Sequence, residues 1–201
     1  VGATILTGGP YVGLLIAAIA AGFLSLIFAF LVLVMRVNQV ISGLTIVFLA
    51  QGLTTLVSTQ MEWTNKSFVG IGGLNFGLLA DIPIIGRFIF GHDIIVYSTI
   101  LIFAATVYIF DQTEIGLRIK AVGENPEAAD SAGVSVLYHR FLAVVVGCML
   151  VGLAGGYLSV VVSKIWVDGM SGGRGWITIA LVIFARWRFW TAMLGLSLIH
   201  I

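Results

Sequence analysis

Four long uncharged apolar segments constrain the fold of this chain more than any other feature. The first, residues 11–35, contains no ionisable side chain of Asp, Glu, Lys, Arg or His and exceeds the roughly 20 residues that a helix needs to cross a bilayer. Three segments of the same kind cover residues 39–58, 94–110 and 141–163. Only helices and closed barrels satisfy their backbone hydrogen bonds in lipid, and these lengths predict transmembrane helices.

Two further apolar stretches follow the fourth segment. Residues 176–185 are short for a crossing unless the helix includes part of the glycine-rich connection 164–175, and residues 189–201 begin another stretch. The composition is 60% hydrophobic and 9% charged, whereas about a quarter of residues are charged in soluble domains. The sequence therefore predicts an all-α, polytopic transmembrane helical bundle with about five spans plus a partial one. We expect residues 1–201 to form a single transmembrane domain and, because they begin without methionine and end within an apolar stretch, to be a fragment of a longer protein.

The sequence lacks the residue patterns of several functional classes. Its one cysteine, Cys148, lies in an apolar run, so neither a disulfide nor a thiolate cluster is expected within the chain. His92, His139 and His200 have no serine or carboxylate neighbour in the pattern of a nucleophile–base pair. No phosphate-binding P-loop motif occurs, and no basic cluster suggests a nucleic-acid partner. We therefore expect neither an enzyme nor a metal site.

Two polar segments separate the spans and indicate the orientation of the chain. Residues 59–93 mix charges with glycines and predict an extramembrane loop with short surface helices, whereas residues 111–140 are the longest polar interruption. If Arg36 faces the cytoplasm, 111–140 lies inside, and 59–93 and 164–175 lie outside. The inside segments then carry six basic residues against four outside: Arg36, Arg118, Lys120, Arg140, Arg186 and Arg188 against Lys66, Arg87, Lys164 and Arg174. Cytoplasmic loops are enriched in Lys and Arg, so this orientation is favoured over its opposite.

The second span carries polar residues on two faces. At 100° per residue, Asn38, Ser42 and Thr45 share one face, and a second set lies roughly opposite: Gln51, Thr54, Thr55 and Ser58. Either the helix is broken near Gly43, or its two halves have different neighbours. Polar groups in a membrane need partners, so these residues either line a path for a polar solute or form hydrogen bonds between helices. The candidate path residues are Asn38, Ser42, Thr45 and Gln51.

The fourth span has a face of small residues. Gly152, Gly155, Gly156, Ser159 and Ser163 fall within about 100° of one another. The G-x-x-x-G spacing of Gly152 and Gly156 favours close approach of a second helix. A hinge or a pore-lining face is the alternative.

Within 111–140, the sequence ENPEAADSAG has the composition of a short capped helix. Asn125 is suited to the cap, Pro126 to the first helical position, and Glu127 to the positive end of the helix dipole. Gly133 permits a left-handed stop. Two turns are marginal in water, so such a helix needs a surface to pack against. A solvated helix without a partner is the alternative.

Three motifs resemble one family of membrane proteins. The sequence GLRIKAVGENPEAADSAGV at 116–134 resembles the cytoplasmic coupling loop of ABC-importer permeases of the branched-chain amino acid and ribose type. The segment WVDGMSGGRGWITIALVIFARW at 166–187 and NQVISGL at 38–44 are similar to permeases for simple sugars and purine nucleosides. The resemblance covers most of residues 1–190, and the tail 195–201 departs from it.

The resemblance implies a permease subunit of an ATP-driven importer for a simple sugar or nucleoside, in the inner membrane of a bacterium or archaeon. ATP and Mg²⁺ would bind to a partner, and this chain would hold no cofactor. The implied partners are an ABC ATP-binding subunit, a second permease subunit (identical or different), an extracytoplasmic substrate-binding protein and membrane lipid. The residues implied to dock on the ATP-binding subunit are Glu124, Asn125, Pro126, Ala128, Ala129 and Gly133. Asp168 and Arg174 are candidates either for contact with the binding protein or for structural pairing.

A secondary transporter or channel without an ATPase is the alternative function. The polar second span would support it. No ionisable residue lies in the confident spans, however, and this absence argues against proton coupling and less strongly against sodium coupling. Pentose, hexose, purine nucleoside and flavin-like substrates all remain compatible with the sequence.

Overall fold

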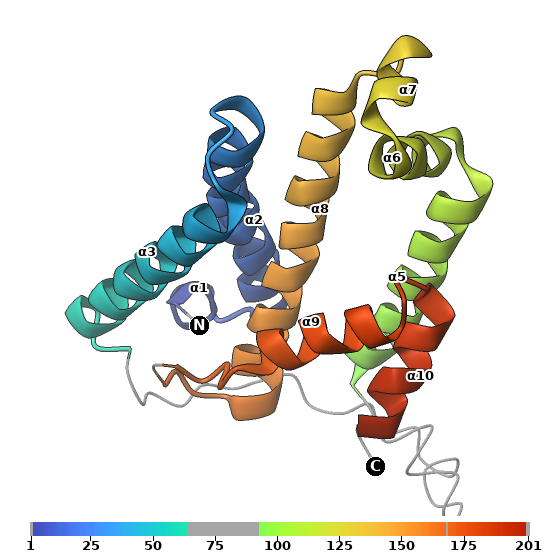
Figure 1. Ribbon diagram of the computed structural model, residues 1–201. Helices are drawn as coiled ribbons and strands as arrows, with labels where there is room; N and C mark the ends of the chain where they lie inside the picture. Colours follow the sequence, from blue (N-terminus) through green and yellow to red (C-terminus); the bar gives the residue numbers. More distant parts are fainter. Residues whose placement is uncertain (1, 64–92, 168, 200–201) are drawn as a thin grey trace, which may run out of the picture. The chain divides into compact units, whose positions relative to one another are not determined.

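The computed structural model describes residues 2–63, 93–167 and 169–199, and every regular element within them is helical (Figure 1). The predicted all-α class is confirmed for this part of the chain. By internal contacts the chain divides into two compact units, Val1–Asp168 and Gly169–Ile201, which are described separately. The first unit contains α1 (Gly2–Thr7), α2 (Pro10–Ala29), α3 (Gln39–Gln60), α5 (Ile94–Gln112), α6 (Glu114–Glu124), α7 (Pro126–Ser131) and α8 (Val136–Tyr157). The second contains α9 (Arg174–Phe184) and α10 (Phe189–Ile199).

Four helices of the first unit are long and apolar enough to cross a membrane. They cover Pro10–Val34, Gln39–Gln60, Ile94–Gln112 and Val136–Ser163, close to the four predicted spans. The fourth begins earlier than the predicted residue 141, because residues 136–140, which include His139 and Arg140, already form its first turn. The fifth predicted segment lies in α9, an apolar helix of 11 residues, in keeping with its short apolar run.

Two of the spans end in a π-helical turn. Span α2 continues into η1 (Phe30–Val34), where the Met35 N–H donates to Phe30 O, five residues earlier, at 3.1 Å. Span α8 continues into η3 (Leu158–Ser163). A basic residue with positive φ follows each turn: Arg36 with φ of 54° and Lys164 with φ of 54°.

Helix α3 is continuous from its first residue to its last. The Asn38 side chain caps it, because Asn38 Oδ1 accepts hydrogen bonds from the Val40 N–H at 2.9 Å and the Ile41 N–H at 3.4 Å. The alternative of a break near Gly43 is therefore wrong. Both polar sets lie on one unbroken helix, whose buried residues are Ser42 from the first set and Ser58 from the second.

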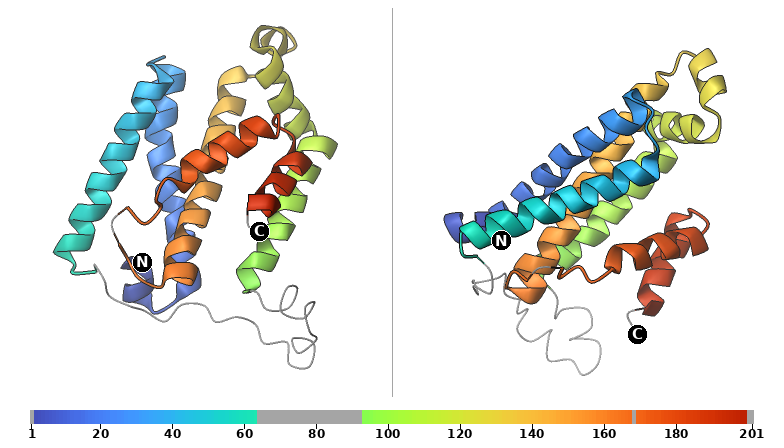
Figure 2. Two further views of the ribbon diagram at one scale, coloured as in Figure 1. Left: turned by 60° about the horizontal axis from the view of Figure 1, so that its bottom comes forward. Right: turned by 60° about the vertical axis from the view of Figure 1, so that its left-hand side comes forward.

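The antiparallel pair α2–α8 forms the best-packed seam of the first unit (Figures 1 and 2). A Cβ atom at Gly156 would lie 2.9 Å from Ala17 Cβ, and one at Gly152 would lie 2.7 Å from Ala17 O and closer still to Ala21 Cβ. Real Cβ atoms do not approach neighbours so closely, so these glycines allow the two helices to touch. The predicted close packing is confirmed for both. Gly155 differs, because a Cβ there would meet nothing within 4 Å.

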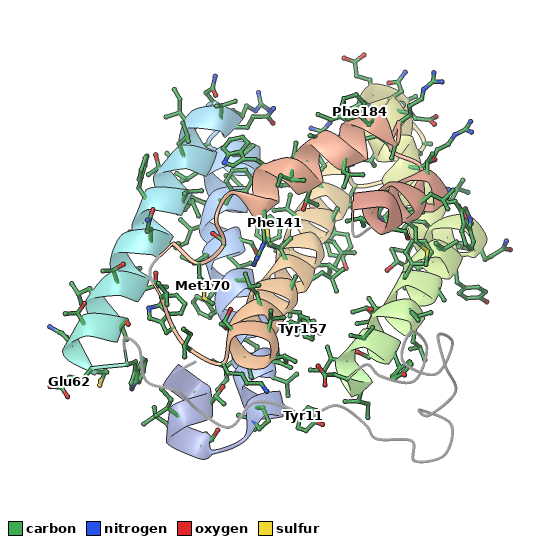
Figure 3. All side chains as sticks on the ribbon, turned by 90° about the horizontal axis from the view of Figure 1, so that it is seen from below. Tyr11, Glu62, Phe141, Tyr157, Met170 and Phe184 are labelled. Atoms are coloured by element: carbon green, nitrogen blue, oxygen red, sulfur yellow. The ribbon has the colours of Figure 1, made fainter. Side chains whose placement is uncertain are left out.

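One end of this seam holds the small hydrophobic core of the unit. Leu14 of α2 packs with Val160 and Val161 of η3, and the half-buried Ile95 of α5 packs against this cluster together with Leu153 and Tyr157. Elsewhere α3 and α5 are little covered within the unit. Side chains project outward from both helices (Figure 3). Many of these are large and apolar: Phe48 of α3 is 69% exposed, and Leu101 of α5 is 71% exposed. Such surfaces suit lipid or further transmembrane helices.

The second unit is a helical hairpin. Its helices α9 and α10 pack on each other where Gly195 lies against the Leu181 side chain. The tight turn between them contains Arg186 with φ of 53° and Trp187 with φ of 60°. The buried Ala185 ends α9.

Candidate functional site

The polar interruption 111–140 folds into two helices, α6 and α7, between α5 and α8 (Figure 1). The sequence predicted only the second of them. Two signals could have revealed α6: Thr113 is an N-cap residue followed by the acidic Glu114, and Ile119 and Val122 lie three residues apart on one face. Val122 is 2% exposed, and α6 packs against both α5 and α8. The interruption is therefore a structured connection.

Helix α7 begins as its sequence predicts. Asn125 Oδ1 accepts a hydrogen bond from the Ala128 N–H at 3.1 Å, Pro126 occupies the first turn, and Glu127 adds the acidic charge there. The predicted cap is confirmed. Because Asn125 also ends α6, one residue sets the angle between the two helices.

Helix α7 ends in a Schellman motif. Gly133 has φ of 80°, its N–H donates to Asp130 O at 2.9 Å, and the Val134 N–H donates to Ala129 O at 3.0 Å. The predicted left-handed stop is confirmed. A Cβ at Gly133 would meet nothing within 4 Å, so only its backbone conformation favours glycine.

The six candidate docking residues are not equally accessible. Glu124, Asn125, Ala128 and Gly133 are exposed, and Pro126 is half-buried. Ala129 is 5% exposed and belongs to the packed side of α7. A partner protein could therefore touch α7 at its first turn and its C-terminal glycine, whereas Ala129 fixes the helix to its own unit.

A groove of about 1090 Å³ lies beside α7. Its walls come from η1 and the ends of α2, α3, α6, α7 and α8 that lie at the same end of the first unit (Figure 1). Arg36 and Arg140 line it together with Glu127 and Asp130. The orientation argument requires Arg36 and the 111–140 segment to share one side of the membrane, and the groove brings them together.

His139 also lines this groove and is 7% exposed. Its Nδ1 atom lies 2.8 Å from Ser135 O. A carbonyl oxygen can only accept, so Nδ1 carries the proton of this hydrogen bond. This hydrogen bond holds the His139 side chain against the start of α8, and we interpret His139 as a structural residue there.

The four candidate path residues of the second span are not brought into one site. Asn38 is occupied as the cap of α3, and Thr45 Oγ1 donates to Ile41 O at 2.9 Å. Gln51 is exposed. Ser42 is 3% exposed, and its hydroxyl has no hydrogen-bond partner among the described residues. Of these four candidates, Ser42 is therefore the one with a buried polar group that has no partner in the described part of the chain.

Of the two candidate contacts with a binding protein, the structure describes one. Asp168 and most of the 59–93 loop lie outside the described residues. Arg174 is the first residue of α9 and is exposed, and its carbonyl oxygen accepts from Thr178 Oγ1 at 2.9 Å. Gly172 and Gly173, with φ of 52° and 79°, turn the chain into α9. The roles proposed for Asp168 and Arg174 remain predictions.

The junction of α5 and α6 contains residues that the sequence analysis did not single out. Lys120 Nζ lies 2.7 Å from Asp111 Oδ1 across the junction, and Gly116 is buried against the last turn of α5. A spacing of nine residues gives no helical signal, so this ion pair could not be read from the pattern. Among the residues that the structure describes, no group of three or more His, Cys, Asp or Glu side chains could hold a metal ion.

Comparison with known proteins gives one family and several relatives. The family described as "Branched-chain amino acid transport system / permease component" matches residues 1–201. A protein of Haloferax volcanii that is named "Putative glucose ABC transporter permease protein TsgC13" is 37% identical over 189 residues, which are 92% of this chain and 57% of that protein. The guanosine ABC transporter permease protein NupQ of Bacillus subtilis is 31% identical over 89% of this chain and 57% of its own length.

A third relative, the nucleoside ABC transporter permease protein NupC of Lactococcus lactis, is 28% identical over 92% of this chain and 60% of its own length. The chain thus spans somewhat more than half the length of the curated relatives that it matches. No solved structure matches it significantly.

Proposed function

Because the chain belongs to the family of permease components of branched-chain amino acid transport systems, we propose that it is part of the permease subunit of an ATP-driven importer. It is a multi-pass membrane protein with four helices of spanning length in its described part. The proposed location is the inner membrane of a bacterium or archaeon. The relatives named for glucose, guanosine and nucleosides support a simple sugar or nucleoside as the substrate.

The observation that carries the proposal is the capped helix α7 held between two spans. A six-residue helix is not stable alone, and this one is fixed by the Asn125 cap, the Gly133 stop and the buried Ala129. Its exposed first turn forms a small, rigid surface outside the apolar spans. Such a surface suits docking on a cytoplasmic ATP-binding subunit, which would hydrolyse the ATP.

The proposed mechanism follows from rigid-body motion. Closure of two ATP-binding subunits around ATP would draw the α7 helices of two permease subunits together, and the spans would convert this displacement into inward-open and outward-open states. The binding protein would deliver the substrate on the opposite side, near 59–93 and 164–175, where Asp168 and Arg174 are the candidate contacts. Along the path, the buried Ser42 hydroxyl is the best candidate for a hydrogen bond to a substrate hydroxyl, ahead of Asn38, Thr45 and Gln51.

The test uses the full-length protein. It is affinity-purified in detergent from its host, and co-purification of an ATP-binding subunit is assayed, followed by uptake of radiolabelled sugars and nucleosides in proteoliposomes. We expect ATP-dependent uptake and loss of uptake in Glu124→Ala, with Glu114→Gln on the exposed start of α6 as the matched control. Uptake that persists without a bound ATPase would contradict the proposal and support a secondary transporter or channel.

A further inference from the structure

Helices α5 and α6 are held together by side-chain contacts in addition to the short connection between them. Thr113 is the only residue between the two helices. Its hydroxyl donates to Ile109 O in α5 at 2.6 Å and accepts from the Gly116 N–H in α6 at 3.3 Å. The same side chain thus caps α6 and holds the last turn of α5.

Gly116 sets the distance between the two helices. A Cβ atom there would overlap Ile109 O and lie 2.5 Å from Phe110 Cα and 2.6 Å from Phe110 O. All three are backbone atoms of α5 and cannot rotate away as a side chain could. Any larger residue at Gly116 must therefore displace α6 from α5.

An ion pair joins α5 and α6 at a second point. Lys120 Nζ lies 2.7 Å from Asp111 Oδ1, with each side chain 45% exposed, and it joins the second turn of α6 to the end of α5. The neighbouring pair Arg118–Glu114, at 3.1 Å, lies wholly within α6, so it does not join this helix to α5. The two pairs therefore offer a matched comparison.

The two spans that flank the loop differ in how they pack within the first unit. Helix α8 is fixed to α2 along the glycine seam. No residue of α5 is buried in the structure, and it contacts the core of the unit through Ile95, near the end opposite to α6. A displacement of α6 can therefore turn α5 about its far end, while α8 resists.

We propose that the contacts of Thr113, Gly116 and Lys120 with the last turn of α5 form a rigid α5–α6 elbow, in which Gly116 and the Asp111–Lys120 pair are positioning residues that pass the displacement of α7 to the third span. The inference rests on the proposed function of the chain. It adds the direction of transmission: motion enters α5 through the elbow, and α8 acts as the fixed support.

The first test compares two glycines of α6 in the full-length transporter with its ATPase. Gly116→Ala is expected to lower substrate uptake by about tenfold, because the added methyl must displace α6 from α5, while the ATPase still co-purifies and hydrolyses ATP. Gly123→Ala is the control, because a Cβ there meets nothing within 4 Å, and its uptake should match the wild type. Unchanged uptake in Gly116→Ala, at normal ATP hydrolysis, would overturn the elbow.

The second test remains decisive if Gly116→Ala cannot be purified. Asp111→Lys and Lys120→Asp should each lower the ratio of substrate imported to ATP hydrolysed by a few-fold, and the double swap should restore it. Arg118→Gln is the control and should leave the ratio unchanged. A double swap as defective as the single variants would refute the positioning role. Absence of any ATPase from the wild-type preparation would instead refute the proposed function itself.

Discussion

The α2–α8 seam and the α6–α7 connection both depend on glycine, for opposite reasons. In the seam, Gly152 and Gly156 have ordinary helical backbones, and a side chain at either would strike the facing helix. At the end of α7, Gly133 has open space around it and a left-handed backbone. The first region depends on glycine for packing and the second for conformation. Their substitutions should therefore differ in size and in what they affect.

The largest effect is expected in the seam. Gly152→Leu would drive its side chain into the Ala17 carbonyl and the Ala21 methyl, and we expect a loss of about 3 kcal/mol in stability. Thermal unfolding of the purified protein in detergent measures this. The control, Gly155→Leu, lies on the same helix in open space and should cost much less. Equal losses of stability at both positions would mean that contact with α2 does not limit the size of the residue at position 152.

The conformational glycine should give an intermediate effect. Gly133→Ala places a Cβ on a residue with φ of 80° and should cost about 1 kcal/mol, whereas Gly133→Asn should cost less, because asparagine tolerates this conformation. We expect the loss to appear as uncoupling of ATP hydrolysis from uptake, with little change in the unfolding temperature. A large fall in that temperature would show that Gly133 is a packing residue after all.

The cap at the other end of α7 should matter to a similar or slightly smaller degree. Asn125→Ala removes the oxygen that accepts from the Ala128 N–H and should cost about 1 kcal/mol. Asn125→Asp keeps the acceptor and should retain uptake. Limited proteolysis of the loop in the purified protein would report the loss of α7, and protection equal to the wild type in Asn125→Ala would contradict the role of the cap.

The smallest effect is expected within α6. Arg118→Gln breaks an exposed ion pair between residues one turn apart, which is worth less than about 0.5 kcal/mol. Unfolding measured at low and high salt should be nearly the same for this variant and the wild type. A clear loss of stability at low salt only would place Arg118 in a larger charge network.

The sequence was sufficient for features that depend on local chemistry. The spans are recognisable because no charge interrupts them, and both ends of α7 follow from Asn125, Pro126 and Gly133, whose effects act within a few residues. Features that depend on tertiary packing were missed or left open. Helix α6 has one apolar face defined by Val122 and its neighbours, and the partner of that face lies elsewhere in the chain. Four polar residues of the second span were candidates for a path, yet the Thr45 hydroxyl bonds to its own backbone, and the Ser42 hydroxyl is buried without a partner among the described residues.

The π-helical turns η1 and η3 have a consequence for how this chain tolerates changes in length. A π-helical turn contains one residue more than the α-helical turn that it replaces, and it confines the extra residue to a single turn. Deleting one residue within Phe30–Val34 would therefore convert η1 into α-helix without altering the register of the seam between Leu14 and Gly22. Because the extra residue is confined to that turn, the following Arg36, a wall residue of the groove, would keep nearly the same position around the helix axis. A deletion of one residue at either of these two places should thus be absorbed within the turn, while the centre of the α2–α8 pair and the end of the span both keep their orientation.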